Sequence, residues 1–119
     1  MSQETAPHLH YRTDKGVTIV GFASPYLQSE ADIETVGAEL RDLVETKGLT
    51  RLVLTFQGVR FVSSSMLAQL AQLQKAVSRA GGKLRLCSLG PSLLEVLHKS
   101  HLDRLFDVAT DETAALNKF

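Results

Sequence analysis

The chain has 119 residues, of which 13 are Lys or Arg and 13 are Asp or Glu, so its formal net charge at neutral pH is zero. This length accommodates one domain and is too short for two. Charges of neither sign form a long block, which argues against a nucleic-acid partner, because phosphate-backbone binding needs a clustered basic surface. Cys87 is the single cysteine and has no internal disulfide partner, so a reducing, cytoplasmic location is expected.

The first seven residues are polar and contain Pro7, which predicts a flexible leader over residues 1–7 and one domain over residues 8–119. This leader has neither the positive end nor the apolar block of a secretory signal. No segment approaches the roughly 20 apolar residues needed to span a bilayer, so direct membrane insertion is not expected.

The first expected elements form an antiparallel hairpin. Leu9–Arg12 and the β-branched run Val17–Phe22 are predicted strands, and the residues 13–16 between them have turn chemistry. Ser29 is the predicted N-cap of a following helix, and Gly48 ends it. The apolar side chains of this helix recur at helical spacing: Ile33, Val36, Leu40, Leu43 and Val44.

A buried parallel unit is predicted next. Leu52–Phe56 is nearly all apolar, as expected of a central strand covered on both faces, and residues 57–62 form a short connection. A second amphipathic helix ends at Gly81-Gly82 and leads to a strand over Lys83–Cys87. Its apolar stripe consists of Leu67, Leu70, Leu73 and Val77. Two strands joined through a helix are parallel with a right-handed crossover.

The last third of the chain contributes smaller elements. The spacing of Ser92 and Glu95 before an apolar run is a capping-box pattern that predicts the start of a third helix. Leu102–Val108 predicts a turn and an edge strand, and Asp111–Asn117 a short terminal helix. The fold class is therefore α/β, with a mixed, mostly parallel sheet of four to five strands, helices packed on it and an N-terminal hairpin.

Catalytic motifs are absent from the sequence. Neither GxGxxG nor GxxxxGK[ST] occurs, so no nucleotide cofactor is expected, and the four histidines have no partners at metal-ligand spacing. Ser64 has no flanking glycines, which argues against a nucleophile elbow, and Cys87 is interpreted as an inert buried thiol. An enzyme using Ser64 or Cys87 as nucleophile remains a minor alternative without an identified base.

The most informative segment is the serine run Ser63-Ser64-Ser65 between the central strand and the second helix. It has two interpretations. In one, a serine caps the helix and the others fill a tight turn. In the other, a serine at the helix N-terminus accepts a phosphate, whose roughly 1.5 to 2 negative charges would meet free amide hydrogens and alter a partner surface.

The chain resembles the STAS domain family, the fold of anti-sigma factor antagonists, over about Leu9 to Leu116. In that family a strand that ends in aspartate leads through a short loop to a phenylalanine-isoleucine-aspartate-serine-serine-glycine-leucine signature that opens a helix. The matching segments here are Leu52–Phe56, the loop from Gln57, and Phe61-Val62-Ser63-Ser64-Ser65-Met66-Leu67. The family's phosphorylated serine or threonine falls on Ser64, with Ser63 and Ser65 as alternatives.

Three positions depart from the family pattern. Thr55 and Ser63 replace two aspartates, which removes negative charge beside the matching hydroxyl, and Met66 replaces the glycine. Methionine is a flexible apolar side chain that can narrow a docking surface or become an anchor on it.

The resemblance implies a protein that binds an anti-sigma factor or serine kinase of the ATPase-kinase type, with ATP held by the partner. The implied interface comprises Gly58, Val59, Arg60, Val62, Ser63, Ser64, Ser65 and Met66. The alternative is a scaffold or accessory subunit that is not phosphorylated, in a signalling array or a lipid-transport complex. Monomer and dimer are both compatible with the sequence.

Overall fold

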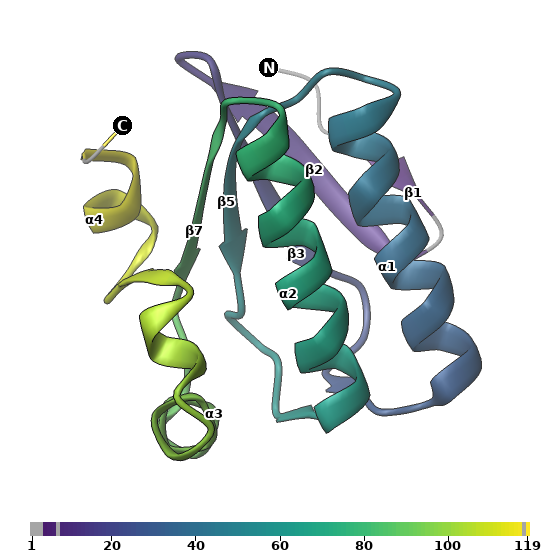
Figure 1. Cartoon of the computed structure of the whole chain (residues 1–119), viewed down its shortest axis with the longest axis vertical. Coiled ribbons are helices and arrows are strands. Elements are labelled where there is room, and N and C mark those ends of the chain that lie inside the picture. Colours follow the sequence, from purple (N-terminus) through teal and green to yellow (C-terminus); the bar gives the residue numbers. More distant parts are fainter. Residues whose placement is uncertain (1–3, 7, 118) are drawn as a thin grey trace.

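The structure is a computed structural model that describes residues 4–6, 8–117 and 119. Figure 1 shows the chain from its purple N-terminal strands to its yellow C-terminal helix. The elements are, in chain order, β1 (Glu4–Ala6), β2 (Leu9–Asp14), β3 (Val17–Phe22), β4 (Tyr26–Leu27), α1 (Glu30–Glu45), β5 (Arg51–Thr55), β6 (Phe61–Val62), α2 (Ser64–Arg79), β7 (Lys83–Cys87), α3 (Pro91–Lys99), the 3-10 helix η1 (Leu102–Arg104), β8 (Asp107–Ala109) and α4 (Glu112–Asn117).

The main sheet has the strand order β1-β2-β3-β5-β7-β8. Strand β2 runs antiparallel to its neighbours β1 and β3, whereas β3, β5, β7 and β8 are parallel. Leu54 of β5 lies in register with Val20 on one side and Leu86 on the other. Strands β4 and β6 form a separate parallel ladder. The predicted α/β class, mixed sheet and opening hairpin are confirmed.

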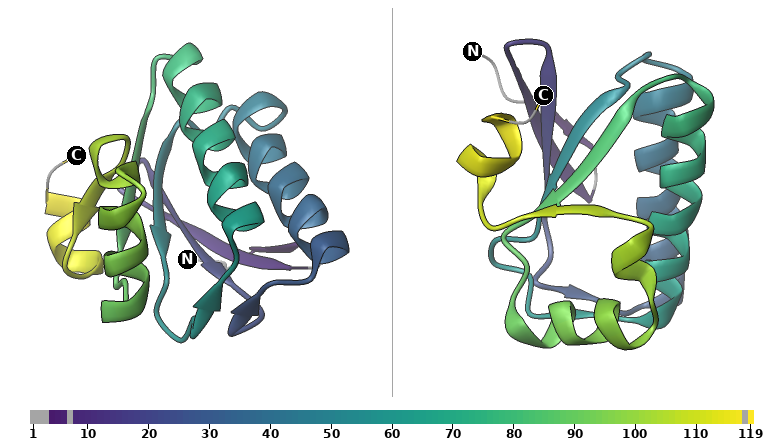
Figure 2. Two further views of the ribbon diagram at one scale, coloured as in Figure 1. Left: turned by 60° about the horizontal axis from the view of Figure 1, so that its bottom comes forward. Right: turned by 60° about the vertical axis from the view of Figure 1, so that its left-hand side comes forward.

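Helices cover the two faces of the sheet unequally. Helices α1 and α2 lie side by side on one face, α4 lies on the opposite face, and α3 lies across one end of the molecule (Figures 1 and 2). The larger hydrophobic core lies beneath α1 and α2, and a smaller one around Val53 and Ala115 lies beneath α4. Among the described residues, no helix has the length and hydropathy to cross a membrane.

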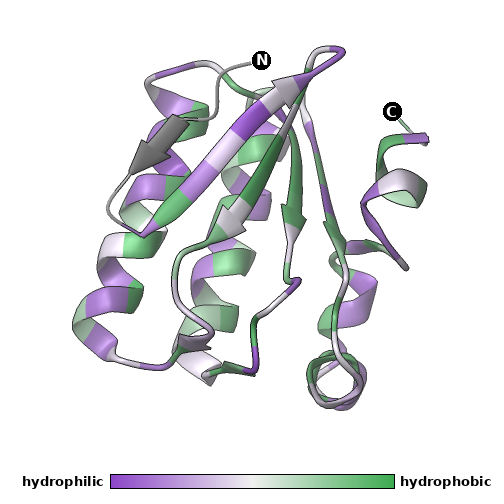
Figure 3. Cartoon of the chain, turned by 180° about the vertical axis from the view of Figure 1, so that it is seen from behind, coloured by the Kyte–Doolittle hydropathy of each residue, from purple (hydrophilic) through white to green (hydrophobic). Residues whose placement is uncertain are grey.

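Burial explains the strand patterns of the sequence. Leu52, Val53 and Leu54 are fully buried because both faces of β5 are covered, which accounts for their lack of polar alternation. Strand β2 alternates instead between buried residues, such as Leu9 and Tyr11, and more exposed ones. The same alternation between hydrophobic and hydrophilic segments along β2 is visible from behind the sheet (Figure 3).

Some predicted boundaries differ from the structure. Glu4–Ala6, within the expected leader, pair with β2 as an edge strand, so the main sheet has six strands rather than four to five. Residues 1–3 and 7 of that leader lie outside the described residues. The expected connection 57–62 contains β6, because its last two residues find a partner in β4. Both differences arise from pairing between strands, which hydrophobic periodicity does not encode.

One predicted helix cap is confirmed in position only, and another is wrong. Ser29 occupies the N-cap position of α1, but its side chain makes no capping hydrogen bond. Helix α3 begins at Pro91 with Gly90 as its N-cap, because proline suits the first helical position, so Ser92 lies inside the helix. Glu95 instead pairs with Lys99 one turn later, with a separation of 2.8 Å between its Oε1 and the lysine Nζ.

Other predicted ends agree with the structure. Gly48 follows α1 with a φ of +67° and Gly81 follows α2 with a φ of +74°, backbone conformations that glycine adopts without strain. The terminal helix α4 is confirmed, and the Asp111 carboxylate accepts a hydrogen bond from the Ala114 amide at 2.8 Å.

Candidate functional site

The serine run lies where α2 begins, and its first residue is the helix cap. Ser63 has an extended backbone, with a φ of −77° and a ψ of 164°. Its hydroxyl oxygen accepts a hydrogen bond from the Met66 amide at 3.3 Å, and its carbonyl accepts one from the Leu67 amide at 3.2 Å. The predicted capping by one serine of the run is therefore confirmed and belongs to Ser63.

The other two serines differ in exposure. Ser64, the first residue of α2, is exposed, whereas Ser65 is partly buried. The Ser65 hydroxyl lies 3.5 Å from the Glu30 carboxylate at the start of α1. Ser64 is therefore the most accessible of the three hydroxyls, and it is followed by a helix whose first amide groups have no intrahelical acceptor.

An exposed aromatic pair lies beside the serine run. Tyr26 of β4 and Phe61 of β6 are register partners in the two-stranded ladder. Their side chains are 50% and 48% exposed, more than any other large hydrophobic residue of the described chain. Exposed aromatic side chains of this size are typical of protein interaction surfaces.

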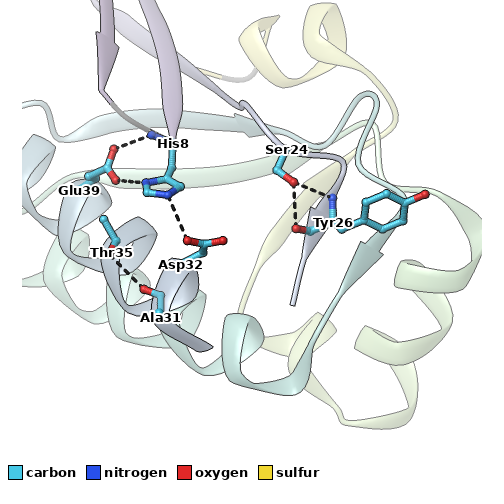
Figure 4. Close-up of polar contacts among 7 residues, drawn as sticks. All are labelled: His8, Ser24, Tyr26, Ala31, Asp32, Thr35 and Glu39. Carbon is cyan, nitrogen blue, oxygen red and sulfur yellow. Dashed lines mark hydrogen bonds and ion pairs between the residues drawn. The ribbon is translucent and has the colours of Figure 1, made fainter. Parts of the chain in front are cut away.

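Backbone hydrogen bonds hold this pair in position. The Pro25 carbonyl accepts the amide hydrogens of Arg60 and Phe61 at 2.7 and 3.2 Å, and the Leu27 carbonyl accepts that of Ser63 at 2.9 Å. At the start of β4, the Ser24 hydroxyl accepts from the Tyr26 amide and donates to the Tyr26 carbonyl, both at 3.1 Å (Figure 4). The ladder therefore ties the turn before α1 to the start of α2.

The loop before β6 carries three of the predicted interface residues. Gly58 has a φ of +84°, and the Val59 amide donates to the Phe56 carbonyl at 2.9 Å, which closes the turn. Arg60 is exposed. Val59 and Val62 are partly buried against the main core, so only part of each side chain is accessible to a partner.

The prediction that Met66 belongs to the partner interface is wrong. Its side chain is 0% exposed and belongs to the main core, so no partner reaches it. Met66 is the third residue of α2 and shares an inward face with Leu67 and Leu70. A methionine at the family's glycine position thus fills space beneath the helix rather than adding to the surface.

A groove separates β6 from the first turns of α3. It encloses about 350 Å³, with β6 and the preceding loop on one side and Gly90 to Leu93 with Val96 on the other. Among the described residues that line it, Arg60 alone is charged. Sequence reasoning missed the α3 side of this groove and also missed Tyr26. Pro91 is the one local signal for the α3 side, since it marks the start of a helix. The proximity of this helix to β6 depends on the fold and has no local signal in the sequence.

The Cys87 thiol and the His98 ring lie in surroundings that serve the structure rather than catalysis. Cys87 is fully buried, and desolvation raises the pKa of its thiol, which favours the unreactive neutral form. His98 Nδ1 lies 3.1 Å from the Asp103 carboxylate. Within the described part of the chain, no three His, Cys, Asp or Glu side chains converge as metal ligands would.

A separate polar cluster joins the N-terminal part of the chain to α1. His8 Nδ1 lies 2.8 Å from Glu39 Oε2, and His8 Nε2 lies 3.5 Å from Asp32 Oδ1 (Figure 4). The His8 amide also donates to Glu39 Oε1 at 3.1 Å. The hydrogen bond to Glu39, aided by the charges of both carboxylates, raises the pKa of His8. This cluster connects the turn between β1 and β2 to α1 and has no nucleophile.

The STAS domain family matches residues 9–115. The chain is 33% identical over 91 residues to BtrV, a proposed anti-sigma factor antagonist of Bordetella bronchiseptica, covering 76% of this chain and 78% of BtrV. It is 30% identical over 101 residues to YvdB, a proposed sulfate transporter of Bacillus subtilis, covering 85% of this chain but only 18% of the transporter.

Solved structures agree on the fold. A proposed anti-sigma factor antagonist of Thermotoga maritima superposes with a TM-score of 0.81 at 20% identity, covering 91% of each chain. The phosphorylated form of the Bacillus cell-fate determinant SpoIIAA gives a TM-score of 0.70 at 16% identity, covering 92% of this chain and 97% of SpoIIAA.

The strand-to-helix junction with its serine run and the mixed sheet define an α/β domain with the same fold as these structures. The chain belongs to the STAS domain family.

Proposed function

We propose that this chain is a regulatory domain that binds an anti-sigma factor or a serine kinase of the ATPase-kinase type and is switched by phosphorylation of Ser64. The observation that carries the proposal is the exposure of Ser64 at the start of α2, beside the exposed pair Tyr26 and Phe61. The similarity to BtrV supports the same class of partner.

The three serines of the run differ in how well each can accept a phosphate. Ser63 uses its hydroxyl to cap α2, and a phosphate on Ser65 would lie against the negative charge of Glu30. Ser64 has neither restriction, and a phosphate there lies at the positive end of the helix dipole.

The phosphorylation step transfers the γ-phosphoryl group of ATP to Ser64 Oγ. The Oγ–P bond forms as the bond from the γ-phosphorus to the bridging oxygen breaks, ADP leaves, and a base of the kinase takes the hydroxyl proton. ATP and Mg²⁺ belong to the partner, and this domain contributes only the nucleophilic hydroxyl. The added negative charge then weakens docking at the neighbouring apolar surface.

The test is to mix the purified chain with its candidate ATPase-kinase, with and without ATP, and to measure binding by calorimetry and phosphate by mass spectrometry. We expect a complex without ATP, one phosphate on Ser64 with ATP, and release of the modified chain. Ser64→Ala should bind without being phosphorylated, Ser64→Asp should bind weakly, and Ser65→Ala is the matched control. Absence of both binding and phosphate on the serine run would reject the proposal.

A second candidate is an accessory domain that binds its partner constitutively, as part of a signalling array or a transport complex. The similarity to YvdB, of which the chain spans 18%, favours it, as do Thr55 and Ser63 at the positions of the family's aspartates. It predicts that Ser64→Asp leaves complex formation unchanged, whereas the switch predicts release.

A further inference from the structure

The groove between β6 and α3 has a free backbone edge. The amides of Phe61 and Ser63 both donate to carbonyls of the β4 segment, those of Pro25 and Leu27. Since successive residues of a strand direct their backbone groups to opposite sides, the N–H and C=O of Val62 point away from β4. Strand β6 lies between β4 and α3 in the left view of Figure 2, and Val62 lines the groove.

The other wall combines apolar surface with the amino end of a helix. Leu93 and Val96 of α3 line the groove, and Val96 is 42% exposed. Gly90 is the N-cap of α3 and has no side chain to bond the first amide groups. These amides and the Arg60 guanidinium give the groove a positive character, and no carboxylate is found among its described lining residues.

We propose that this groove binds an extended peptide segment of the partner, which adds a strand to the free edge of β6. The segment carries an apolar side chain that packs against Phe61 and Val96, and an Asp or Glu that meets Arg60 and the amino end of α3. This mode of recognition obtains affinity from backbone hydrogen bonds and specificity from alternate side chains. The inference rests on the proposed function, because it names the segment of the partner that docks beside Ser64.

The geometry also links the groove to the switch. Ser64 follows Val62 by two residues, so their Cα atoms are at most about 7 Å apart. That separation is within the screening length of roughly 8 Å at physiological ionic strength. A phosphate on Ser64 therefore adds negative charge beside Val62 at the edge of the groove, which disfavours a bound segment that carries an acidic residue.

The first experiment selects binders from a phage library of random nine-residue peptides on the immobilised full chain, and measures the affinity of the enriched peptides by fluorescence anisotropy. We expect sequences that combine Asp or Glu with an apolar residue, and binding about tenfold weaker to Arg60→Glu and to Val96→Asp. Arg79→Glu, at the opposite end of α2, is the control for charge. Leu94→Asp is the control for α3, because Leu94 is similarly exposed but does not line this groove.

The second experiment replaces each amide of an enriched peptide in turn by its N-methyl form. Strand addition requires loss of binding at alternate residues, because only those amides pair with β6. Enriched peptides without a carboxylate, undiminished binding to Arg60→Glu, an N-methyl pattern without this alternation, or no enrichment would each overturn the inference. None of these measurements requires the kinase, so a failure here is distinguishable from a failure of the phosphorylation switch.

Discussion

The Ser65 hydroxyl lies 3.5 Å from the carboxylate of Glu30, so the first turns of α1 and α2 meet beside the serine run. These two residues are 35 positions apart in the chain. The contact distinguishes two neighbouring serines, because Ser65 lies against a negative charge whereas Ser64 faces solvent.

This difference predicts the site of phosphorylation. With the candidate kinase and ATP, Ser64→Ala should abolish phosphate incorporation, and Ser65 should stay unmodified because a phosphate there is repelled by Glu30. Phosphopeptide mass spectrometry checks the result. The Glu30→Gln variant of this chain removes the repulsion and is the matched control. Phosphate on Ser65 while Glu30 is intact would contradict the prediction.

Ser63 and Ser64 should differ in their effect on stability. Ser63→Ala removes the hydroxyl that accepts the Met66 amide and should lower the free energy of unfolding by about 1 kcal/mol. Ser64→Ala removes an exposed hydroxyl and should change it by less than about 0.5 kcal/mol. Urea denaturation followed by circular dichroism measures both, and equal effects would show that the cap does not stabilise α2.

Met66 should behave as a core residue. Met66→Ala leaves a cavity beneath α2 and should lower the free energy of unfolding by about 2 to 5 kcal/mol. Met66→Leu, of similar volume, should cost less than about 1.5 kcal/mol. If Met66→Ala instead weakened partner binding with unchanged stability, the side chain would belong to the interface after all.

The His8 cluster should make stability depend on pH. Because Glu39 raises the pKa of folded His8 above its ordinary value of 6.5, the stabilisation is fully present below pH 6.5 and is lost as pH rises through the folded-state pKa. Glu39→Gln should lower the free energy of unfolding by roughly 0.5 to 1 kcal/mol at pH 6, and by less at pH 9. Urea denaturation at both pH values measures the difference.

A matched variant on the same helix controls this experiment. Glu34 is an exposed carboxylate of α1 outside the His8 cluster, so Glu34→Gln should leave the pH dependence unchanged. An NMR titration of the His8 ring should give a midpoint above 6.5 in the wild-type chain and a lower one in Glu39→Gln. The same midpoint in both proteins would exclude Glu39 as the cause.

Cys87 should resist thiol reagents. Its side chain is fully buried, and desolvation raises its pKa, so little thiolate is present and the reagent has no access. Labelling with dithiobis-nitrobenzoate should be at least about tenfold slower in buffer than in denaturant, since reaction requires opening of the structure. Rapid labelling of the folded chain would point instead to a reactive thiol.

Much of the fold was predictable because its signals are local. The apolar spacing around Leu40 and Leu70 predicts two helices, and the apolar run at Leu52–Phe56 predicts a strand covered on both sides. The Ser63 to Ser65 run marks the junction between that strand and the second helix in the same way. Hydrophobic periodicity indicates which face of a helix or strand is buried, but not which other element packs against that face.

The surface around that junction depended on the tertiary structure. Pairing of Tyr26 with Phe61, the contact of Ser65 with Glu30 and the groove beside Val96 all join residues far apart in the chain. The main helices and strands and the place of the serines follow from the sequence alone, because propensity and burial act over a few residues. Only packing decided that Met66 is buried and Ser64 exposed, since the same helical turn presents different sides to the core and to solvent.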